Sequence, residues 1–89
     1  MRVTVEVFAY LRLRLGQKSI FLDLEDGSDL HEVVRCIGDL YGREVKDLIV
    51  TGDGQGFNVV FLVNGHGALP EQRLKDGDVV SIHPPIGGG

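Results

Sequence analysis

Polar and apolar residues alternate at the start of the chain, where every second residue is a valine: Val3, Val5 and Val7. A period of two carried by β-branched side chains is typical of a half-buried strand, here expected over residues 2–8. Residues 19–24 repeat the pattern, with three apolar residues on one side: Ile20, Leu22 and Leu24. The short connection, with a turn expected at Gly16, predicts that the two strands form a hairpin.

A helical period follows, in which apolar residues recur every three or four positions: Leu30, Val33, Val34, Ile37, Leu40 and Tyr41. This one-sided stripe predicts an amphipathic helix over residues 30–41. Asp29 is the expected N-cap, with Glu32 in the capping-box position, and Ser28 is the alternative cap. Gly42 stands where a residue in the left-handed conformation would end the helix.

The second half of the chain has a weaker pattern. Between residues 43 and 57 we expect no more than a short turn packed under the sheet, formed by Val45, Leu48 and Ile49. The apolar run 59–63 predicts a central strand that is buried on both faces or nearly so. Asn64-Gly65 is a tight-turn signal, and residues 66–74 are expected to be irregular with a short strand. A last strand over residues 79–83 ends at Pro84-Pro85, because proline cannot donate to a sheet ladder.

These elements predict an α+β fold, a mixed sheet of four to five strands packed on one main helix. One helix covers only one face of a sheet, so the other face is expected to meet solvent or a partner. We divide the chain into a folded domain, residues 1–83, and a flexible C-terminal tail, residues 84–89.

Composition narrows the possible functions. The chain has 89 residues, enough for one domain with a modest core and too few to enclose a deep active site. A net charge of −4 argues against nucleic-acid binding, and a single cysteine excludes an internal disulfide or a zinc site built on several thiolates. No apolar run approaches the length of a membrane span, and the start of the chain alternates like a strand rather than a signal peptide. We therefore expect a cytoplasmic protein that binds no membrane.

The chain offers little for catalysis or cofactor binding. The three histidines, His31, His66 and His83, lack the spacing of metal ligands, and no base is indicated for Cys36. The glycine-rich loop 52–56 lacks the Lys-Ser/Thr ending of a phosphate-binding loop. Four acidic residues lie close together in the sequence: Asp23, Glu25, Asp26 and Asp29. They form either a cation site or, as we expect, part of a solvated loop beside the start of a helix. We predict no metal site, no bound cofactor and no independent catalysis.

The C-terminus is the informative feature, because three glycines follow directly on a strand and a proline pair: Gly87, Gly88 and Gly89. Such an end is either a frayed or artificially added terminus, or a segment with a function of its own. Consecutive prolines favour an extended backbone, so residues 83–89 reach about 20 Å at ~3.3 Å per residue. A thread without side chains can enter a narrow cleft of another protein. Its terminal carboxylate becomes reactive if a partner enzyme activates it, for example as an acyl-adenylate.

Residues 74–86, Leu-Lys-Asp-Gly-Asp-Val-Val-Ser-Ile-His-Pro-Pro-Ile, followed by the glycines, resemble the C-terminal signature of a sulfur-carrier family. This family includes the small subunit of molybdopterin synthase and the thiamin sulfur carrier. Val63-Asn64-Gly65 resembles the preceding strand and turn, and residues 1–13, with Phe8-Ala9, resemble the opening strand. The length and the proline pair favour the molybdopterin branch.

The resemblance implies a ubiquitin-like β-grasp fold and a set of partners. A ubiquitin-activating-like adenylyltransferase would use ATP to adenylate Gly89, which follows Gly88, and a sulfur donor protein would supply the sulfur of a thiocarboxylate. The tail would then enter the large subunit of molybdopterin synthase. Two alternatives stay open: a ubiquitin-like modifier joined to lysines through the same glycine, and a sulfur carrier of thiamin or cysteine synthesis.

The chain departs from the family pattern in two places. It ends in three glycines where two are common, and His83 stands where relatives often carry an aromatic residue before the prolines. We expect a partner-facing surface of Phe8, His83 and one of Val60 or Leu62, of which we choose Leu62, because exposed aromatic residues anchor interfaces. Core packing is the alternative for Phe8. The tail residues Pro84, Pro85, Ile86 and Gly87 complete the predicted partner contact.

Overall fold

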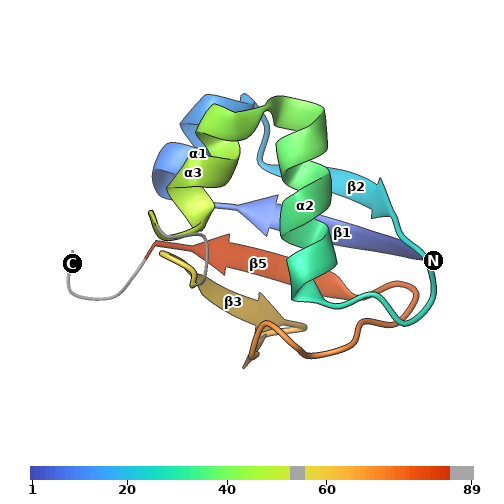
Figure 1. The fold of residues 1–89 in the computed structure, drawn as a ribbon. Helices are drawn as coiled ribbons and strands as arrows, with labels where there is room; N and C mark the ends of the chain where they lie inside the picture. Colours follow the sequence, from blue (N-terminus) through green and yellow to red (C-terminus); the bar gives the residue numbers. More distant parts are fainter. Residues whose placement is uncertain (53–55, 85–89) are drawn as a thin grey trace.

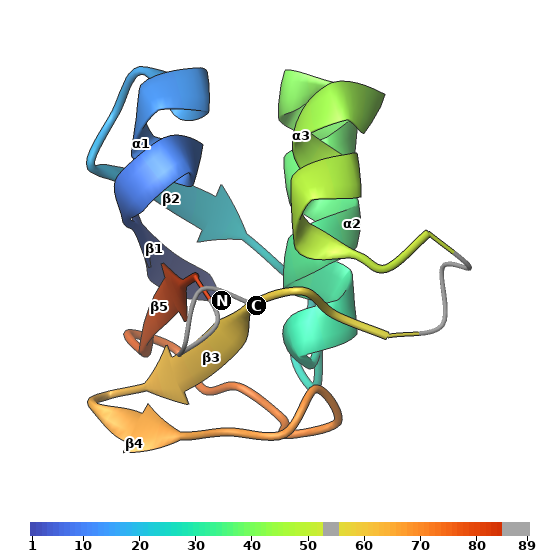
Figure 2. The same ribbon diagram turned by 90° about the vertical axis from the view of Figure 1, so that its left-hand side faces the viewer.

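The computed structural model describes residues 1–52 and 56–84. Three helices lie on one side of a five-stranded sheet, as Figures 1 and 2 show from two directions. In chain order the elements are β1 (Arg2–Val7), α1 (Ala9–Leu15), β2 (Ser19–Asp23), α2 (Leu30–Tyr41), α3 (Arg43–Ile49), β3 (Val60–Val63), β4 (His66–Gly67) and β5 (Val79–His83). The predicted α+β fold with a mixed sheet is confirmed, and α2 is the main helix, accompanied by two short ones.

The strands lie in the order β2-β1-β5-β3-β4. The neighbouring strands β1 and β5 run parallel, whereas the other pairs are antiparallel. Because parallel strands end at the same edge of a sheet, the end of β1 and the end of β5 come together although they are far apart in the sequence. This pairing positions the candidate site described below.

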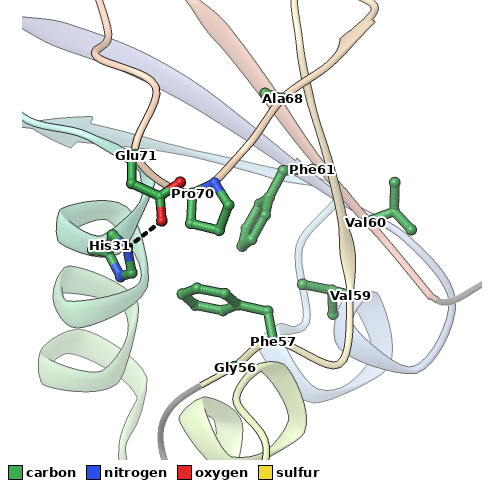
Figure 3. A pocket seen from close by; sticks show the side chains of 9 residues that line it. All are labelled: His31, Gly56, Phe57, Val59, Val60, Phe61, Ala68, Pro70 and Glu71. Atoms are coloured by element: carbon green, nitrogen blue, oxygen red, sulfur yellow. Dashed lines mark ion pairs between the residues drawn. The ribbon is translucent and has the colours of Figure 1, made fainter.

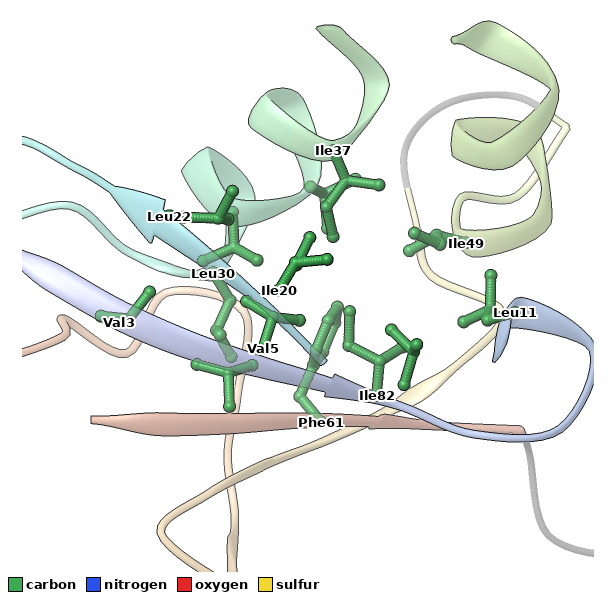
Figure 4. Close-up of a cluster of buried hydrophobic side chains, with 14 of the residues drawn as sticks. Val3, Val5, Leu11, Ile20, Leu22, Leu30, Ile37, Ile49, Phe61 and Ile82 are labelled. Atoms are coloured by element: carbon green, nitrogen blue, oxygen red, sulfur yellow. The ribbon is translucent and has the colours of Figure 1, made fainter. Parts of the chain in front are cut away.

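The core lies between the sheet and the helices (Figure 4). The three valines of β1 are buried, as their alternation predicts, and so are four residues of the α2 stripe: Leu30, Val33, Val34 and Ile37. Burying one such side chain stabilises the fold by about 1.5–3 kcal/mol. The core therefore depends on the face of the sheet that the helices cover.

The connection between β1 and β2 differs from the prediction. The two strands pair antiparallel, from Arg2 opposite Asp23 to Glu6 opposite Ser19, but a helix, α1, replaces the expected turn. Leu11 and Leu15 lie one helical turn apart and are both buried, so tertiary packing stabilises this short helix. Gly16 ends α1 in the left-handed conformation, with φ +74°.

The boundaries of α2 follow the prediction closely. The side chain of Asp29 accepts a hydrogen bond from the N–H of Glu32 at 3.2 Å, which confirms Asp29 as the N-cap. Gly42 ends the helix as expected, but its φ of 99° and ψ of 169° lie outside the left-handed helical region. This conformation lets the chain turn at once into α3, which replaces the short turn expected there and buries Val45 and Ile49.

The prediction for the apolar run 59–63 is wrong in one respect. Phe61 and Val63 of β3 are buried, but Val60 is 36% exposed and Leu62 is only half-buried. The physical reason is that helices cover one face of the sheet, so every second residue of β3 lies on the uncovered face. The tight turn is confirmed, because Asn64 and Gly65 both have positive φ, 51° and 83°.

Candidate partner-binding surface where the last strand ends

The uncovered face of the sheet brings together residues from three strands. Val60 lies opposite His83 in the pairing of β3 with β5, and Leu62 lies opposite Ser81. Residues that face each other across a ladder share one side of the sheet, so Val60 and Leu62 both lie on the face that carries His83. The sequence predicted one of these two apolar residues on this face, and the structure places both there.

Phe8 joins this surface from the end of β1. Its ring stacks on the ring of His83, with centroids 4.3 Å apart and planes at 14°. Phe8 is half-buried, has extended backbone angles and is absent from the hydrophobic core. The core-packing alternative for Phe8 is therefore wrong. The parallel register that sets Val7 beside Ile82 also explains why the next residue of each strand makes this contact.

Arg12 completes the cluster, and the sequence reasoning missed it. Its guanidinium carbon lies 5.3 Å from the centroid of the Phe8 ring, and its Nε donates a hydrogen bond to the carbonyl of Val7 at 3.3 Å. A cation over an aromatic face contributes about 0.5–1 kcal/mol at an exposed site. The signal in the sequence is the spacing of four between Phe8 and Arg12, which has meaning only once α1 is known to be a helix. We call Phe8, Arg12, Val60, Leu62 and His83 the tail-base surface.

The imidazole of His83 contains one polar atom in an unfavourable environment. Its Nε2 is buried and has no hydrogen-bond partner among the residues that the structure describes. A buried polar atom without a partner costs about 1–3 kcal/mol. The stacked Phe8 ring and the pairing of β5 with β3 hold the imidazole in this position despite that cost.

The chain leaves the sheet directly after this cluster. Pro84, half-buried, is the last residue that the structure describes, and β5 leads into it without interruption. The other predicted tail residues, Pro85, Ile86, Gly87, Gly88 and Gly89, lie outside the described residues, and so does the middle of the glycine-rich loop 52–56. Contact of the tail residues with a partner stays a prediction.

Two of the remaining candidates for chemistry have structural roles. No group of three or more His, Cys, Asp or Glu side chains that could hold a metal ion occurs in residues 1–52 and 56–84. Of the four loop carboxylates, Asp29 caps α2 and Asp23 pairs with Arg2 at 3.2 Å. Burial raises the pKa of the Cys36 thiol, against the opposing effect of Arg35, so the thiol is protonated at neutral pH and is a weak nucleophile.

Sequence reasoning also missed a hollow in the molecule. This cavity of about 430 Å³ lies between the first turn of α2 and β3 (Figure 3). The ring of Phe57 lies 5.3 Å from that of His31 and 5.2 Å from that of Phe61, and His31 Nε2 is 3.7 Å from a carboxylate oxygen of Glu71. Val60 is among the residues that line this cavity, although its side chain belongs to the uncovered sheet face.

Comparison with known proteins identifies the family. The model of the ThiS family matches residues 5–89. The chain belongs to the ThiS family. Small archaeal modifier protein 3 of Haloferax volcanii is 32% identical over 93 residues, which cover all of both chains. This ThiS-family chain is thus one of the small ubiquitin-like proteins that act as sulfur carriers or protein modifiers, and the predicted ubiquitin-like β-grasp fold is confirmed.

Solved structures support the same grouping. The candidate molybdopterin converting factor subunit 1 of Pyrococcus furiosus is 30% identical, with a TM-score of 0.80 over 97% of this chain and 99% of the other. A complex of subunits 1 and 2 of molybdopterin-converting factor from Helicobacter pylori matches at 26% identity and a TM-score of 0.63, over the full length of both chains. Members of this family are carriers and modifiers rather than catalysts. Among the described residues, no helix is long and apolar enough to span a bilayer.

Proposed function

We propose that this chain is the sulfur-carrying small subunit of molybdopterin synthase, a protein co-substrate that catalyses nothing alone. The observation that carries the proposal is the tail-base surface, which places stacked aromatic rings and two apolar side chains where β5 leads into the tail. An interface centre is typically aromatic and apolar with few charges. Similarity to subunit 1 of molybdopterin converting factors, one of them in complex with subunit 2, supports a large-subunit partner.

The proposed chemistry takes place on the carboxyl carbon of Gly89. An adenylyltransferase of the ubiquitin-activating type joins this carboxylate to the α-phosphate of ATP, and pyrophosphate leaves. Hydrosulfide (HS⁻) released by the sulfur donor protein then attacks the acyl carbon, the bond to AMP breaks, and AMP leaves, which gives the thiocarboxylate. The ATP requirement is consistent with a cytoplasmic location.

In the second stage the large subunit accepts the charged tail. Gly87 and Gly88 allow the tail to pass through a channel that is only wide enough for the backbone, because glycine has no side chain that needs further space. The tail-base surface docks outside this channel and sets how far the tail enters. This chain contributes the docking contacts and the reactive carbon, and the large subunit contributes the pterin precursor that receives the sulfur.

A protein modifier is the second candidate function, favoured by the 32% identity to small archaeal modifier protein 3. Activation of Gly89 is the same, but a lysine amine attacks the acyl carbon and forms an isopeptide bond. A sulfur carrier of thiamin or cysteine synthesis shares the thiocarboxylate and differs in the acceptor.

Intact-mass spectrometry separates these functions. The chain is incubated with a purified adenylyltransferase, ATP and a sulfur source, and we expect a mass gain equal to the replacement of one oxygen by sulfur. Addition of the large subunit and the pterin precursor should return the original mass. A variant that lacks Gly88 and Gly89 is the control, and it should fold normally and gain no mass.

Each other outcome has a distinct meaning. Conjugates of higher mass that contain lysine isopeptides would favour the modifier. A thiocarboxylate that the pterin precursor does not discharge would favour another biosynthetic pathway. If neither sulfur transfer nor conjugation occurs with any activating enzyme, both proposals are wrong.

A further inference from the structure

β2 is the edge of the sheet that lies farthest from β4, and it pairs only with β1 among the described residues. The N–H of Leu24 donates to the carbonyl of Met1, and antiparallel ladder bonds recur at every second residue. The residues of β2 whose peptide groups point away from β1 are therefore the odd-numbered ones: Ser19, Phe21 and Asp23. No hydrogen bond to their peptide groups occurs within the part of the chain that the structure describes.

This edge lacks two of the features that usually prevent strand pairing. Its register with β1 runs through five consecutive pairs without a bulge, and it contains no proline. Phe21, the middle residue of β2, is 66% exposed, and Leu40 of α2, beside the same edge, is 63% exposed. Both line a groove of about 400 Å³ between β2 and α2, together with Leu22, Cys36 and two carboxylates, Asp23 and Asp39. The middle of the edge is thus apolar, and its charge is confined to the end at Asp23.

We infer that β2 pairs with β2 of a second copy of this chain, antiparallel about a twofold axis at Phe21. A strand with an odd number of residues and its exposed aromatic residue in the middle is complementary to itself in this arrangement. The two Phe21 rings lie opposite each other, and Ser19 of each copy faces Asp23 of the other. The hydroxyl of Ser19 can donate to that carboxylate. Three outward-facing pairs exchange roughly six backbone hydrogen bonds.

Other registers are less favourable. A shift of two residues in either direction places Phe21 opposite a polar residue. A shift of four sets the two Asp23 carboxylates face to face in one direction and places Phe21 opposite Gln17 in the other. Like charges directly opposite each other destabilise a strand pair. The self-complementary register is therefore the one in which every outward-facing side chain has a compatible partner.

Charge complementarity on the helix side of the sheet supports the same register. Lys18 has no ion pair with any residue in the described part of the chain, and the twofold arrangement sets it opposite Leu24 of the other copy. Leu24 borders a hollow of about 510 Å³ that Glu25, Glu32 and Arg35 also line, and Arg35 already pairs with Glu32. In the proposed dimer the Lys18 ammonium group of one copy therefore pairs with Glu25 of the other.

This pairing leaves the proposed tail function untouched. Two strands, β1 and β5, separate β2 from β3, so the tail-base surface stays accessible in each copy. The paired form presents two tails. Because each contribution is a five-residue strand, the contact is small beside the ~1,600 Å² of a standard stable interface. We therefore expect an equilibrium between monomer and dimer that depends on protein concentration.

Sedimentation velocity of the full chain over a range of concentrations tests the pairing. We expect a shift from monomer to dimer mass, and we expect Phe21→Lys to weaken association by about tenfold or more. Leu13→Lys is the matched control, because Leu13 lies on α1, is 83% exposed, and undergoes the same kind of change from apolar to charged. A monomer at every concentration, or equal loss in both variants, would overturn the inference.

Ser19→Pro provides a test that changes no charge. The N–H of Ser19 points outward and proline is tolerated at the first residue of an edge strand, so the fold should persist while pairing is lost. Far-UV circular dichroism checks the fold. Dimerisation unchanged by Ser19→Pro would contradict pairing through this edge.

A disulfide test reads the register directly. Hydrogen-bonded antiparallel pairs have Cα atoms ~5.5 Å apart, within the range that a disulfide bridges. Phe21→Cys in a Cys36→Ser background should form a disulfide-linked dimer on mild oxidation, whereas Leu13→Cys in the same background should do so far more slowly. Equal rates would refute a twofold axis at Phe21. Both variants should still gain sulfur at Gly89, so failure here is distinguishable from failure of the proposed function.

Discussion

The two faces of the sheet contain alternate residues of the same strands, yet they have different roles. On the covered face, Val5, Val80 and Ile82 are fully buried beneath the helices. On the uncovered face, Phe8 and His83 are half-buried, and Val60 is 36% exposed. One face stabilises the molecule, and we propose that the other contacts partners. Substitutions on the two faces should therefore affect different measurements.

The largest effect on stability is expected on the covered face. Ile37 of α2 is fully buried, and Ile37→Ala should lower the free energy of unfolding by about 2–5 kcal/mol, because it removes buried methyl groups and leaves a cavity. Urea denaturation measures this change. Val60→Ala on the uncovered face is the comparison and should cost less than about 1 kcal/mol. Equal losses would contradict the division between the two faces.

Substitutions on the uncovered face should change the affinity for the large subunit. Phe8→Ala removes the ring that stacks on His83 and contacts the Arg12 guanidinium. We expect affinity for the large subunit, measured by calorimetry, to fall by about tenfold or more, which is the range of interface anchors. Leu13→Ala changes an exposed apolar residue of α1 and should leave affinity unchanged. Full affinity in Phe8→Ala would remove the tail-base surface from the proposed interface.

A smaller effect on stability is expected at the start of α2, the helix that covers the sheet. Asp29→Ala removes the side-chain oxygen that accepts the N–H of Glu32, and it should cost about 1 kcal/mol of stability. Ser28→Ala, at the other position that the sequence offered as a cap, should cost less. The two variants are compared by thermal and urea unfolding. A larger loss in Ser28→Ala would show that the cap had been misassigned.

The smallest effect on stability is expected at Ala9, where the chain leaves β1 on the sheet and enters α1. Ala9 follows Phe8 and has φ +54°, a conformation that is strained for any residue with a Cβ atom. Ala9→Gly should raise the free energy of unfolding by up to about 1 kcal/mol, because relief of strain exceeds the entropy that glycine adds to the unfolded chain. A loss of stability on urea denaturation would show that helix propensity at Ala9 outweighs this strain.

Local signals in the sequence were sufficient for part of the fold. Alternation located β1 and β2, the stripe and Asp29 located α2, and Asn64-Gly65 located the tight turn. Each of these signals depends on neighbouring residues within one element. The family resemblance also placed Phe8 beside His83, a contact between residues at opposite ends of the chain that no local pattern contains.

The short helices and the division of β3 between two faces depended on the tertiary structure. Seven-residue helices are unstable alone, and α1 and α3 persist because Leu11, Leu15, Val45 and Ile49 reach the core. Arg12 could not be assigned to the tail-base surface before α1 was known. The sequence by itself determined which residues alternate and where the main helix begins. Only the tertiary structure decided which face the helices cover, because burial depends on contacts between elements that lie far apart along the chain.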